Sequence, residues 1–296
     1  MVLCIHCIIE IERRLFVTNK KVENLIIGFG KAGKTLANVL GNKGEKTVLV
    51  EKSPLMYGGT CINVGCIPSK FLATAADRRS FSGGSDAEYY KNAVVQKKAL
   101  IAKLNQVNYD KVASNENVEV LDGLASFKDE HTVQVRNGSE VSEVYAERIF
   151  VNTGARPFIP SVPGLEVGKR IHTSETLMNL EEFPKSLAIL GSGFIGLEFA
   201  ATYAKFGTKV TIIDQGDRIL PREDEDVAKE VFSSYQAMGV DFLFHAALNQ
   251  VSQDEKAVHL SYTVNGEKKE LSVEAFLVAT GRQANTEELH LENAGV

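Results

Sequence analysis

Gly28-Phe29-Gly30-Lys31-Ala32-Gly33 is the stretch that decides the fold of this chain. It has the spacing GxGxxG and lies between a short apolar segment, residues 24–28, and a helical pattern that extends to about Leu40. A second apolar segment, residues 47–50, follows and ends at Glu51. A strand, a glycine-rich turn, a helix, a strand and an acid in this order are the fingerprint of a dinucleotide-binding unit.

The three glycines and the acid have separate roles in such a unit. Gly28 makes the tight turn, Gly30 lets a pyrophosphate approach the backbone, and Gly33 allows the helix to pack closely on the strand. The N-terminus of the helix supports the phosphate charge. We therefore predict that Glu51 accepts hydrogen bonds from ribose hydroxyls.

The same arrangement recurs at an offset of 163 residues. An apolar segment, residues 186–190, precedes the glycine motif, a helical stretch runs through Phe206, and a second apolar segment, residues 209–213, ends at Asp214. Two such units predict that the chain binds two dinucleotides. We expect a hydride to be transferred from one dinucleotide to the other. The candidate ligands of the second dinucleotide are Gly191, Gly193, Phe194, Ile195, Gly196 and Asp214.

Between the two copies lies a segment with two closely spaced cysteines. Residues 58–70 read Gly-Gly-Thr-Cys-Ile-Asn-Val-Gly-Cys-Ile-Pro-Ser-Lys. Cys61 and Cys66 can close a small disulfide ring, which exchanges electrons in pairs. The segment leads into a predicted helix, whose N-terminal N–H groups and dipole favour a thiolate, and Lys70 adds positive charge one turn further on. Our hypothesis is that a flavin reduces this pair, which then reduces a substrate.

Composition limits the class of protein. The chain has 296 residues, of which 44% are hydrophobic and 24% charged, as is ordinary for a globular protein with two domains. The net charge of −5 argues against nucleic-acid and anionic-membrane partners. No apolar run approaches the roughly 18 residues that span a bilayer. The first ten residues lack the features of a signal peptide, and four cysteines are too few for a disulfide scaffold, so we expect a cytoplasmic protein.

The rest of the chain supplies the elements around the two motifs. The first unit is expected to continue with an amphipathic helix over 86–114, a strand at 118–121, an antiparallel meander at 131–135 and 141–145, and a buried strand at 148–152. The second unit is expected to continue with a helix over 224–238 and strands near 241–244, 257–263, 269–273 and 275–278. Each unit ends its sheet with a Thr-Gly turn, Thr153-Gly154 and Thr280-Gly281.

Together these landmarks resemble the class I pyridine nucleotide–disulfide oxidoreductases, such as dihydrolipoamide dehydrogenase, glutathione reductase and mercuric reductase. The resemblance extends from about Val22 to the end, and residues 58–70 carry it most specifically. Residues 28–34 and 56–59 look most like a bacterial branch of reactive-chlorine and hypothiocyanous acid reductases, associated with oxidative stress. The resemblance implies an α/β fold with two Rossmann-like three-layer nucleotide-binding domains, each with an antiparallel β-meander.

By this resemblance the first unit binds FAD and the second binds NAD. The FAD-binding domain would cover residues 23–155, with 279–296 returning to it, and the NAD-binding domain would cover 156–278. Residues 1–22 are expected to be a disordered extension, in which Cys4 and Cys7 lack the second ligand pair of a zinc site. Beyond the residues of the second motif, the implied cofactor-binding residues are Gly28, Gly30, Gly33, Glu51, Lys52, Gly59, Thr60, Lys70, Ala125, Thr153, Gly154, Gly281 and Arg282.

The resemblance also assigns catalytic roles. Lys70 would lie near flavin N5 and pair with Glu198, which agrees with the rule that a buried charge needs a partner. Cys66 would be the charge-transfer thiol against the flavin, and Cys61 would be the thiol that attacks the substrate. The substrate would be a disulfide, a sulfur electrophile or a thiophilic metal ion, and we expect no bound metal.

The acid of the second unit bears on the choice of nicotinamide cofactor. The carboxylate of Asp214 would bind a free 2′-hydroxyl and repel a 2′-phosphate, which favours NADH over NADPH. Arg218, four residues later, could meet a phosphate, but we interpret it as a solvated loop arginine.

The main departure from the family is length. Family members continue into a dimerisation domain that supplies a catalytic histidine, whereas the six histidines here fall outside any such motif. We therefore expect a truncated chain whose full-length form is a homodimer, and a catalytically incompetent nucleotide-binding fragment is the alternative. A flavin monooxygenase or NADH oxidase is a third interpretation, against which Cys61 and Cys66 argue. A zinc site at these two cysteines lacks a second ligand pair.

Overall fold

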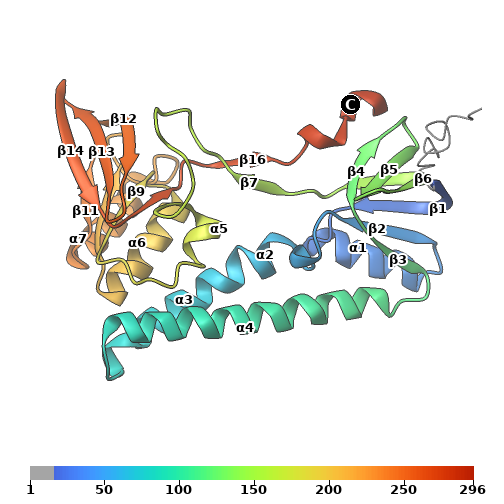
Figure 1. Ribbon diagram of the computed structural model, residues 1–296, viewed down its shortest axis with the longest axis horizontal. Coiled ribbons are helices and arrows are strands. Elements are labelled where there is room, and N and C mark those ends of the chain that lie inside the picture. Colours follow the sequence, from blue (N-terminus) through green and yellow to red (C-terminus); the bar gives the residue numbers. More distant parts are fainter. Residues whose placement is uncertain (1–16) are drawn as a thin grey trace, which may run out of the picture. The chain divides into compact units, whose positions relative to one another are not determined.

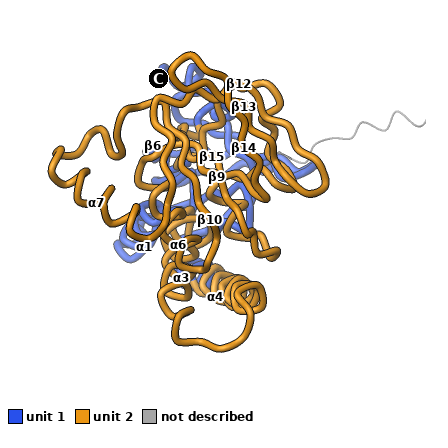
Figure 2. The backbone as a smooth tube through the Cα atoms, turned by 90° about the vertical axis from the view of Figure 1, so that its left-hand side faces the viewer, with its two compact units in different colours: residues 1–57, 108–153, 286–296 blue, residues 58–107, 154–285 orange. Residues whose placement is uncertain are grey.

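The computed structural model describes residues 17–296, which divide into two compact units (Figures 1 and 2). Unit 1 combines residues up to 57 with 108–153 and 286–296, and unit 2 combines 58–107 with 154–285. Residues 1–16 of the predicted extension, which include Cys4 and Cys7, lie outside the described residues. Among the helices of residues 17–296, none is both long and apolar enough to cross a membrane.

Unit 1 is built on a six-stranded sheet with the strand order β3-β2-β1-β6-β5-β4. The first four strands in this order are parallel, and β5 and β4 continue the sheet antiparallel. Helix α1 (Lys31–Asn42) connects β1 to β2. The strands are β1 (Val17–Ile27), β2 (Thr47–Glu51), β3 (Val118–Asp122), β4 (Leu124–Phe127), β5 (Thr132–Asn137) and β6 (Glu140–Val151).

Both faces of the parallel strands are buried, as their continuous apolar runs require. Leu25 and Ile27 of β1 pack in one cluster with residues of β4, β5 and β6. Ile26 packs in another cluster with Ala37 and Leu40 of α1. The 3-10 turns η4 (Glu287–Leu289) and η5 (Leu291–Ala294) also belong to unit 1, where Leu289 joins the first cluster.

Two sequence predictions for this sheet are wrong. Residues 17–22 are not part of an extension but belong to β1, and residues 141–145 and 148–151 do not form two strands but belong to the single strand β6. One cause explains both differences. Residues 17–22 pair with 141–146 in the same parallel ladder that continues through Ile27 and Val151, so each strand supports the full length of the other.

Unit 2 contains a five-stranded parallel sheet with the order β11-β10-β9-β15-β8. Its strands are β8 (Ile171–Thr173), β9 (Ser186–Leu190), β10 (Lys209–Ile213), β11 (Asp241–Leu243) and β15 (Ala275–Val278). The helices α5 (Ser174–Leu177), α6 (Phe194–Phe206) and α7 (Glu225–Ala237) connect them. The order β11-β10-β9-β15 repeats the order β3-β2-β1-β6 of unit 1, which confirms the predicted duplication.

A separate three-stranded antiparallel sheet completes this nucleotide fold. It consists of β12 (Ala246–Gln253), β13 (Val258–Val264) and β14 (Glu267–Val273). The sequence does not reveal β12, because the register of its pairing shifts between Leu248 and Gln250. That bulge interrupts the alternation of buried and exposed residues on which strand prediction depends.

The cysteine segment and the helix after it also pack within unit 2. The segment forms a short helix, α2 (Gly59–Asn63), and a longer helix, α3 (Cys66–Arg78), and the turn η3 (Arg79–Phe81) leads to the long helix α4 (Asp86–Ala113). Leu72 and Ala76 of α3 share a buried cluster with Ala200 of α6. The hydroxyls of Tyr90 on α4 and Tyr203 on α6 are 2.8 Å apart. Helix α3, which begins at Cys66, therefore packs against α6, the helix that the second glycine motif begins.

Candidate active site

The two glycine turns have the same backbone geometry. Gly28 and Gly191 have φ angles of +109° and +107°, a region that favours glycine. A Cβ atom at Gly28 would lie 2.3 Å from the carbonyl oxygen of Asn152, and one at Gly191 would lie 2.6 Å from that of Ala279. Only glycine fits at either turn, as the fingerprint predicts.

The last glycine of each motif is also sterically required, whereas the middle glycine of the second motif is not. A Cβ at Gly33 would lie 2.2 Å from the carbonyl oxygen of Gly28, and one at Gly196 would lie 2.1 Å from that of Gly191. A Cβ at Gly193 would meet no atom within 4 Å. The space above Gly193 is what the approach of a pyrophosphate to the backbone requires.

The acids at the ends of the second strands are held by equivalent hydrogen bonds. The backbone N–H of Phe29 donates to Glu51 Oε2 at 2.9 Å, and that of Ser192 donates to Asp214 Oδ2 at 2.7 Å. The Ser192 hydroxyl also donates to Asp214 Oδ2 at 2.7 Å. Glu51 is only 9% exposed, and this burial raises its pKa. Each acid is thus fixed against its own glycine turn.

Arg218 points its guanidinium at its own loop. Nη2 donates to the carbonyl oxygens of Pro221 at 2.9 Å and Glu223 at 3.3 Å. In the same loop, the N–H of Gly216 donates to Asp214 Oδ1 at 2.8 Å. Asp214 therefore faces the turn of the second glycine motif. Arg218 Nη2 is bonded to loop carbonyls, whereas its Nη1 is buried without a hydrogen-bond partner among residues 17–296.

The cysteine segment bends through two glycines before its helices begin. Gly58 and Gly59 have φ angles of +92° and +75°. The N–H of Val64 donates to the carbonyl oxygen of Thr60 at 3.0 Å and closes α2. A Cβ at Gly65 would lie 2.9 Å from that same oxygen, so glycine permits the tight passage from α2 to α3.

The two cysteines occupy different positions in these helices. Cys61 lies within α2 and is half-buried, whereas Cys66 is the first residue of the 13-residue helix α3 and is exposed. Both residues are thiols, so the predicted disulfide is not formed in this structure. Their role as a redox pair remains a prediction.

The predicted pairing of Lys70 with Glu198 is present. Lys70 Nζ on α3 donates to Glu198 Oε1 on α6 at 2.7 Å. The hydroxyl of Ser69 donates to the same oxygen at 2.9 Å. Sequence reasoning overlooked Ser69, although its place beside Lys70 on one helix was the available signal.

A cavity of about 440 Å³ opens onto this pair within unit 2. Its wall includes Phe194, the residue that follows the second motif's middle glycine, with a side chain that is 69% exposed. The charged and aromatic residues therefore share one recess between α3, α6 and α7. The lining is Lys70, Ala73, Phe194, Leu197, Glu198, Ala201, Thr202, Lys205, Leu220, Val231 and Tyr235.

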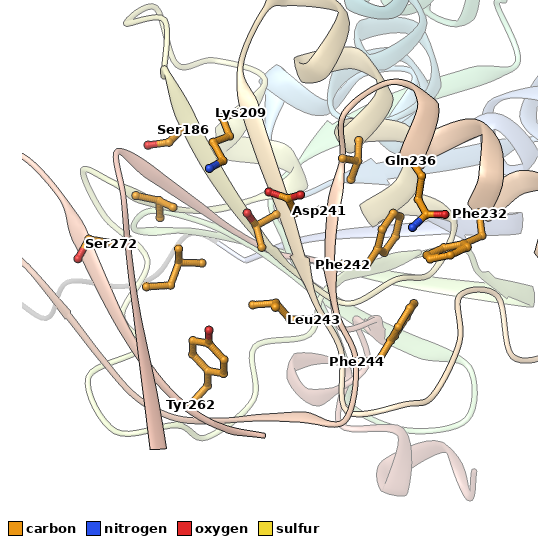
Figure 3. Close-up of a pocket in the computed structure, with 14 residues that line it drawn as sticks. Ser186, Lys209, Phe232, Gln236, Asp241, Phe242, Leu243, Phe244, Tyr262 and Ser272 are labelled. Atoms are coloured by element: carbon orange, nitrogen blue, oxygen red, sulfur yellow. The ribbon is translucent and has the colours of Figure 1, made fainter. Parts of the chain in front are cut away.

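A larger recess, of about 540 Å³, lies between α7, the edge strand β11 and the antiparallel sheet (Figure 3). The rings of Phe232, Phe242 and Phe244 contact one another along its wall. None of the predicted site residues lines it. It is therefore not part of the candidate site.

The two Thr-Gly turns lead into neighbouring strands of unit 2. β7 (Ala155–Pro157) and β16 (Arg282–Ala284) pair antiparallel, and Figure 1 shows them side by side. The N–H of Phe158 donates to the carbonyl oxygen of Gly281 at 2.9 Å, and Arg282 Nη2 donates to the carbonyl of Ala155. The sequence indicates the similarity of the turns, but not that the segments after them pair.

The remaining predicted cofactor residues lie in varied surroundings. Lys52 is exposed and pairs with Glu288. Ala125 is 3% exposed and packs in the core of unit 1, so only its backbone can reach a ligand.

A Cβ at Gly154 would lie 3.9 Å from Thr60 Oγ1, which places these two residues near each other in unit 2. Ile195 is half-buried in α6, and Thr153 is the last residue of its segment in unit 1.

Comparison with known proteins gives consistent results. The family model described as pyridine nucleotide-disulphide oxidoreductase matches residues 22–296. The pyridine nucleotide-disulfide oxidoreductase RclA of Escherichia coli strain K12 is 40% identical over 276 residues, which cover 93% of this chain and 60% of RclA. The dihydrolipoyl dehydrogenase of Geobacillus stearothermophilus is 34% identical over 284 residues, with 93% and 60% coverage.

A solved structure is also similar to this chain. The Cu(II) complex of the HOCl-induced flavoprotein disulfide reductase RclA from Escherichia coli superposes with a TM-score of 0.86 at 40% identity. The match covers 94% of this chain and 60% of that one. The chain thus spans about 60% of the length of these relatives.

Proposed function

Because the chain belongs to the pyridine nucleotide-disulphide oxidoreductase family, we propose that it is an NADH-dependent flavoprotein disulfide reductase with Cys61 and Cys66 as its redox pair. The observation that carries the proposal is the arrangement around α3. Cys66 begins this helix, and Lys70, one turn later, pairs with Glu198 on the helix that the second glycine motif opens. Cys66 is exposed at the start of this helix, and helix N-termini are among the positions where reactive cysteines occur.

The first glycine motif fits FAD. Gly28 and Gly33 have no room for a side chain. Helix α1 begins after Gly30, and the N–H groups of its first turn are those that would bind a pyrophosphate. The Glu51 carboxylate has capacity beyond its bonds to the N–H groups of Phe29 and Ser53, because two carboxylate oxygens accept about four hydrogen bonds. Bound FAD supplies two-electron chemistry: it accepts a hydride from NADH and passes the electron pair to a disulfide.

The second glycine motif favours NADH over NADPH. Asp214 is anchored by Ser192 and Gly216, so its carboxylate is in place to accept a ribose 2′-hydroxyl. A 2′-phosphate would face that negative charge. Arg218 is the nearby cation that could compensate, but its Nη2 donates to the carbonyls of its own loop and its Nη1 is buried.

The thiol chemistry then follows from the two cysteines. Two electrons break the Cys61–Cys66 bond and leave two thiols, of which Cys66 lies at the N-terminus of α3. The Cys61 thiolate attacks a sulfur of the substrate disulfide and releases the first product thiolate. Cys66 then attacks the Cys61 sulfur, which releases the second product thiol and forms the Cys61–Cys66 bond again.

The substrate class extends to sulfur electrophiles and thiophilic metal ions. The solved structure of RclA is a Cu(II) complex of an HOCl-induced enzyme, which supports an oxidant- or metal-stress role for this chain also. Two Cu(II) ions would take one electron each as the thiol pair closes to a disulfide. We place this reaction in the cytoplasm, and propose a homodimer for the full-length form.

Replacing Cys61 tests the proposal. The chain, loaded with FAD, is expected to reduce a small aromatic disulfide with NADH. Cys61→Ser should abolish this reduction while NADH still bleaches the flavin, because only the thiol that attacks the substrate is lost. Cys7→Ser is the matched control and should behave like the wild type.

Two results would contradict the proposal. Disulfide reduction that survives Cys61→Ser would exclude the thiol mechanism. Stable FAD binding with no flavin reduction by NADH would instead support the alternative of a nucleotide-binding fragment without turnover, which the partial coverage of the relatives makes worth testing.

A further inference from the structure

The first turn of α3 makes two contacts with one carboxylate oxygen. Ser69 and Lys70 are consecutive, and both donate to Glu198 Oε1. We propose that Ser69, rather than Lys70, is the positioning residue that holds Glu198 and the first turn of α3 in place, and with them Cys66. The positioning of α3 by Ser69 does not depend on the proposed function, whereas the effect on thiol formation at Cys66 rests on it.

The hydroxyl of Ser69 has one hydrogen and two acceptors within reach. Glu198 Oε1 lies at 2.9 Å, and the carbonyl oxygen of Cys66 lies at 3.4 Å. The nearer acceptor is also the charged one, and hydrogen bonds to ionised acceptors are stronger than those between neutral groups. The hydrogen is therefore directed at Glu198, and the serine links α3 to α6.

Lys70 is poorly suited to the same task. Its side chain is 71% exposed, whereas that of Glu198 is 32% exposed. An exposed ion pair gains little, because water and salt screen it and the long lysine side chain loses rotamer freedom. Serine has fewer side-chain torsions to fix than lysine, so its hydrogen bond costs less entropy. The hydroxyl is the better anchor, and the ammonium contributes mainly charge.

The hydrogen bond between Ser69 and Glu198 lies close to Cys66 along α3. Toward the far end of α3, Leu72 and Ala76 pack in a buried cluster with Ala200 of α6. Within α6, the Thr202 hydroxyl donates to the carbonyl oxygen of Glu198 at 2.8 Å. The near end of α3 has the Ser69 contact, one turn after Cys66. Loss of that contact should free the first turn of α3 and leave its far end attached.

Amide hydrogen exchange in the flavin-free chain tests the positioning directly. Ser69→Ala is expected to accelerate exchange in residues 67–72 about tenfold, because a hydrogen bond to a charged acceptor is lost. Ser69→Thr retains the hydroxyl and should restore protection. Lys70→Met should change exchange in this segment much less than Ser69→Ala does.

The wild-type chain provides a second measurement that needs no variant. Raising the salt to about 0.5 M should leave the protection of residues 67–72 unchanged, since a short hydrogen bond is screened far less than an exposed ion pair. The proposal is overturned if salt removes the protection, or if Lys70→Met accelerates exchange as much as Ser69→Ala.

The catalytic consequence is measured separately in the FAD-loaded chain. Ser69→Ala should slow the appearance of new thiols in a single NADH turnover by about tenfold, leave the NADH concentration for half-saturation unchanged, and be rescued by Ser69→Thr. An unchanged rate would overturn the link to Cys66 even if the exchange result holds. Failure of the wild type itself to form thiols would count against the proposed function and leave the exchange result intact.

Discussion

At the scale of single residues, His172 carries the clearest consequence for stability. It is 5% exposed on β8, and neither ring nitrogen has a hydrogen-bond partner among residues 17–296. Burial lowers its pKa to about 4. Between about pH 6.5 and about pH 4, His172 therefore binds a proton in the unfolded chain but not in the folded chain. The free energy of unfolding falls as the pH drops through this range. The loss should approach 3 kcal/mol, at about 1.4 kcal/mol for each pH unit.

His172→Leu should remove this acid sensitivity, because the leucine cannot be protonated in the unfolded state. Urea unfolding at pH 7 and about pH 4 measures it: the difference between the two pH values should be smaller in the variant than in the wild type. Equal differences would show that His172 is hydrated or partnered in the fold. The sequence places His172 outside any motif, and its burial follows from pairing between β8 and β15, which residue type alone does not reveal.

Only some contacts of the candidate site could be predicted from the sequence. The pairing of Lys70 with Glu198 follows from opposite charges in two recognisable motifs, and it is present. The Ser69 contact is not predictable in that way, since a hydroxyl can bond to backbone, solvent or side chain. Only the packing of α3 on α6 selects its partner.

At the scale of elements, we expect two glycines of the second motif to have different roles: Gly196 is needed for folding, and Gly193 is needed for NADH binding. Gly196→Ala should destabilise unit 2 by about 1–3 kcal/mol, because its Cβ would lie 2.1 Å from the Gly191 carbonyl oxygen and push α6 away from β9. Gly193→Ala is the matched control for folding, since its Cβ meets nothing within 4 Å. It should retain stability and weaken NADH binding. Urea unfolding and NADH titration distinguish the two, and a stable Gly196→Ala variant would contradict the steric argument.

The elements that the sequence predicts are those with a local cause. The glycine turns, their flanking strands and α6 follow from composition and spacing, and the structure confirms them. The length of β6 and the pair of β7 and β16 depend on partners more than 100 residues away. The bulge that hides β12 is likewise a property of its pairing with β13.

At the scale of the whole molecule, the duplication is the organising feature. Both sheets have the same order of four parallel strands, and both hold an acid against a glycine turn. Chain order places the cysteine segment between β2 and β3 of the first sheet, yet its helix α3 packs on α6 of the second. The domain boundaries proposed from sequence remain predictions, because continuity along the chain does not determine which core a segment joins.

The central claim is that electrons from NADH reach the pair Cys61 and Cys66. Its most direct test is to count thiols in the oxidised, FAD-loaded chain by alkylation and mass spectrometry, before and after one equivalent of NADH without oxygen. We predict that both Cys61 and Cys66 become alkylated for each NADH consumed, and that Cys61→Ser gains no thiol. A flavin that is fully reduced while Cys61 and Cys66 remain unmodified would contradict the account.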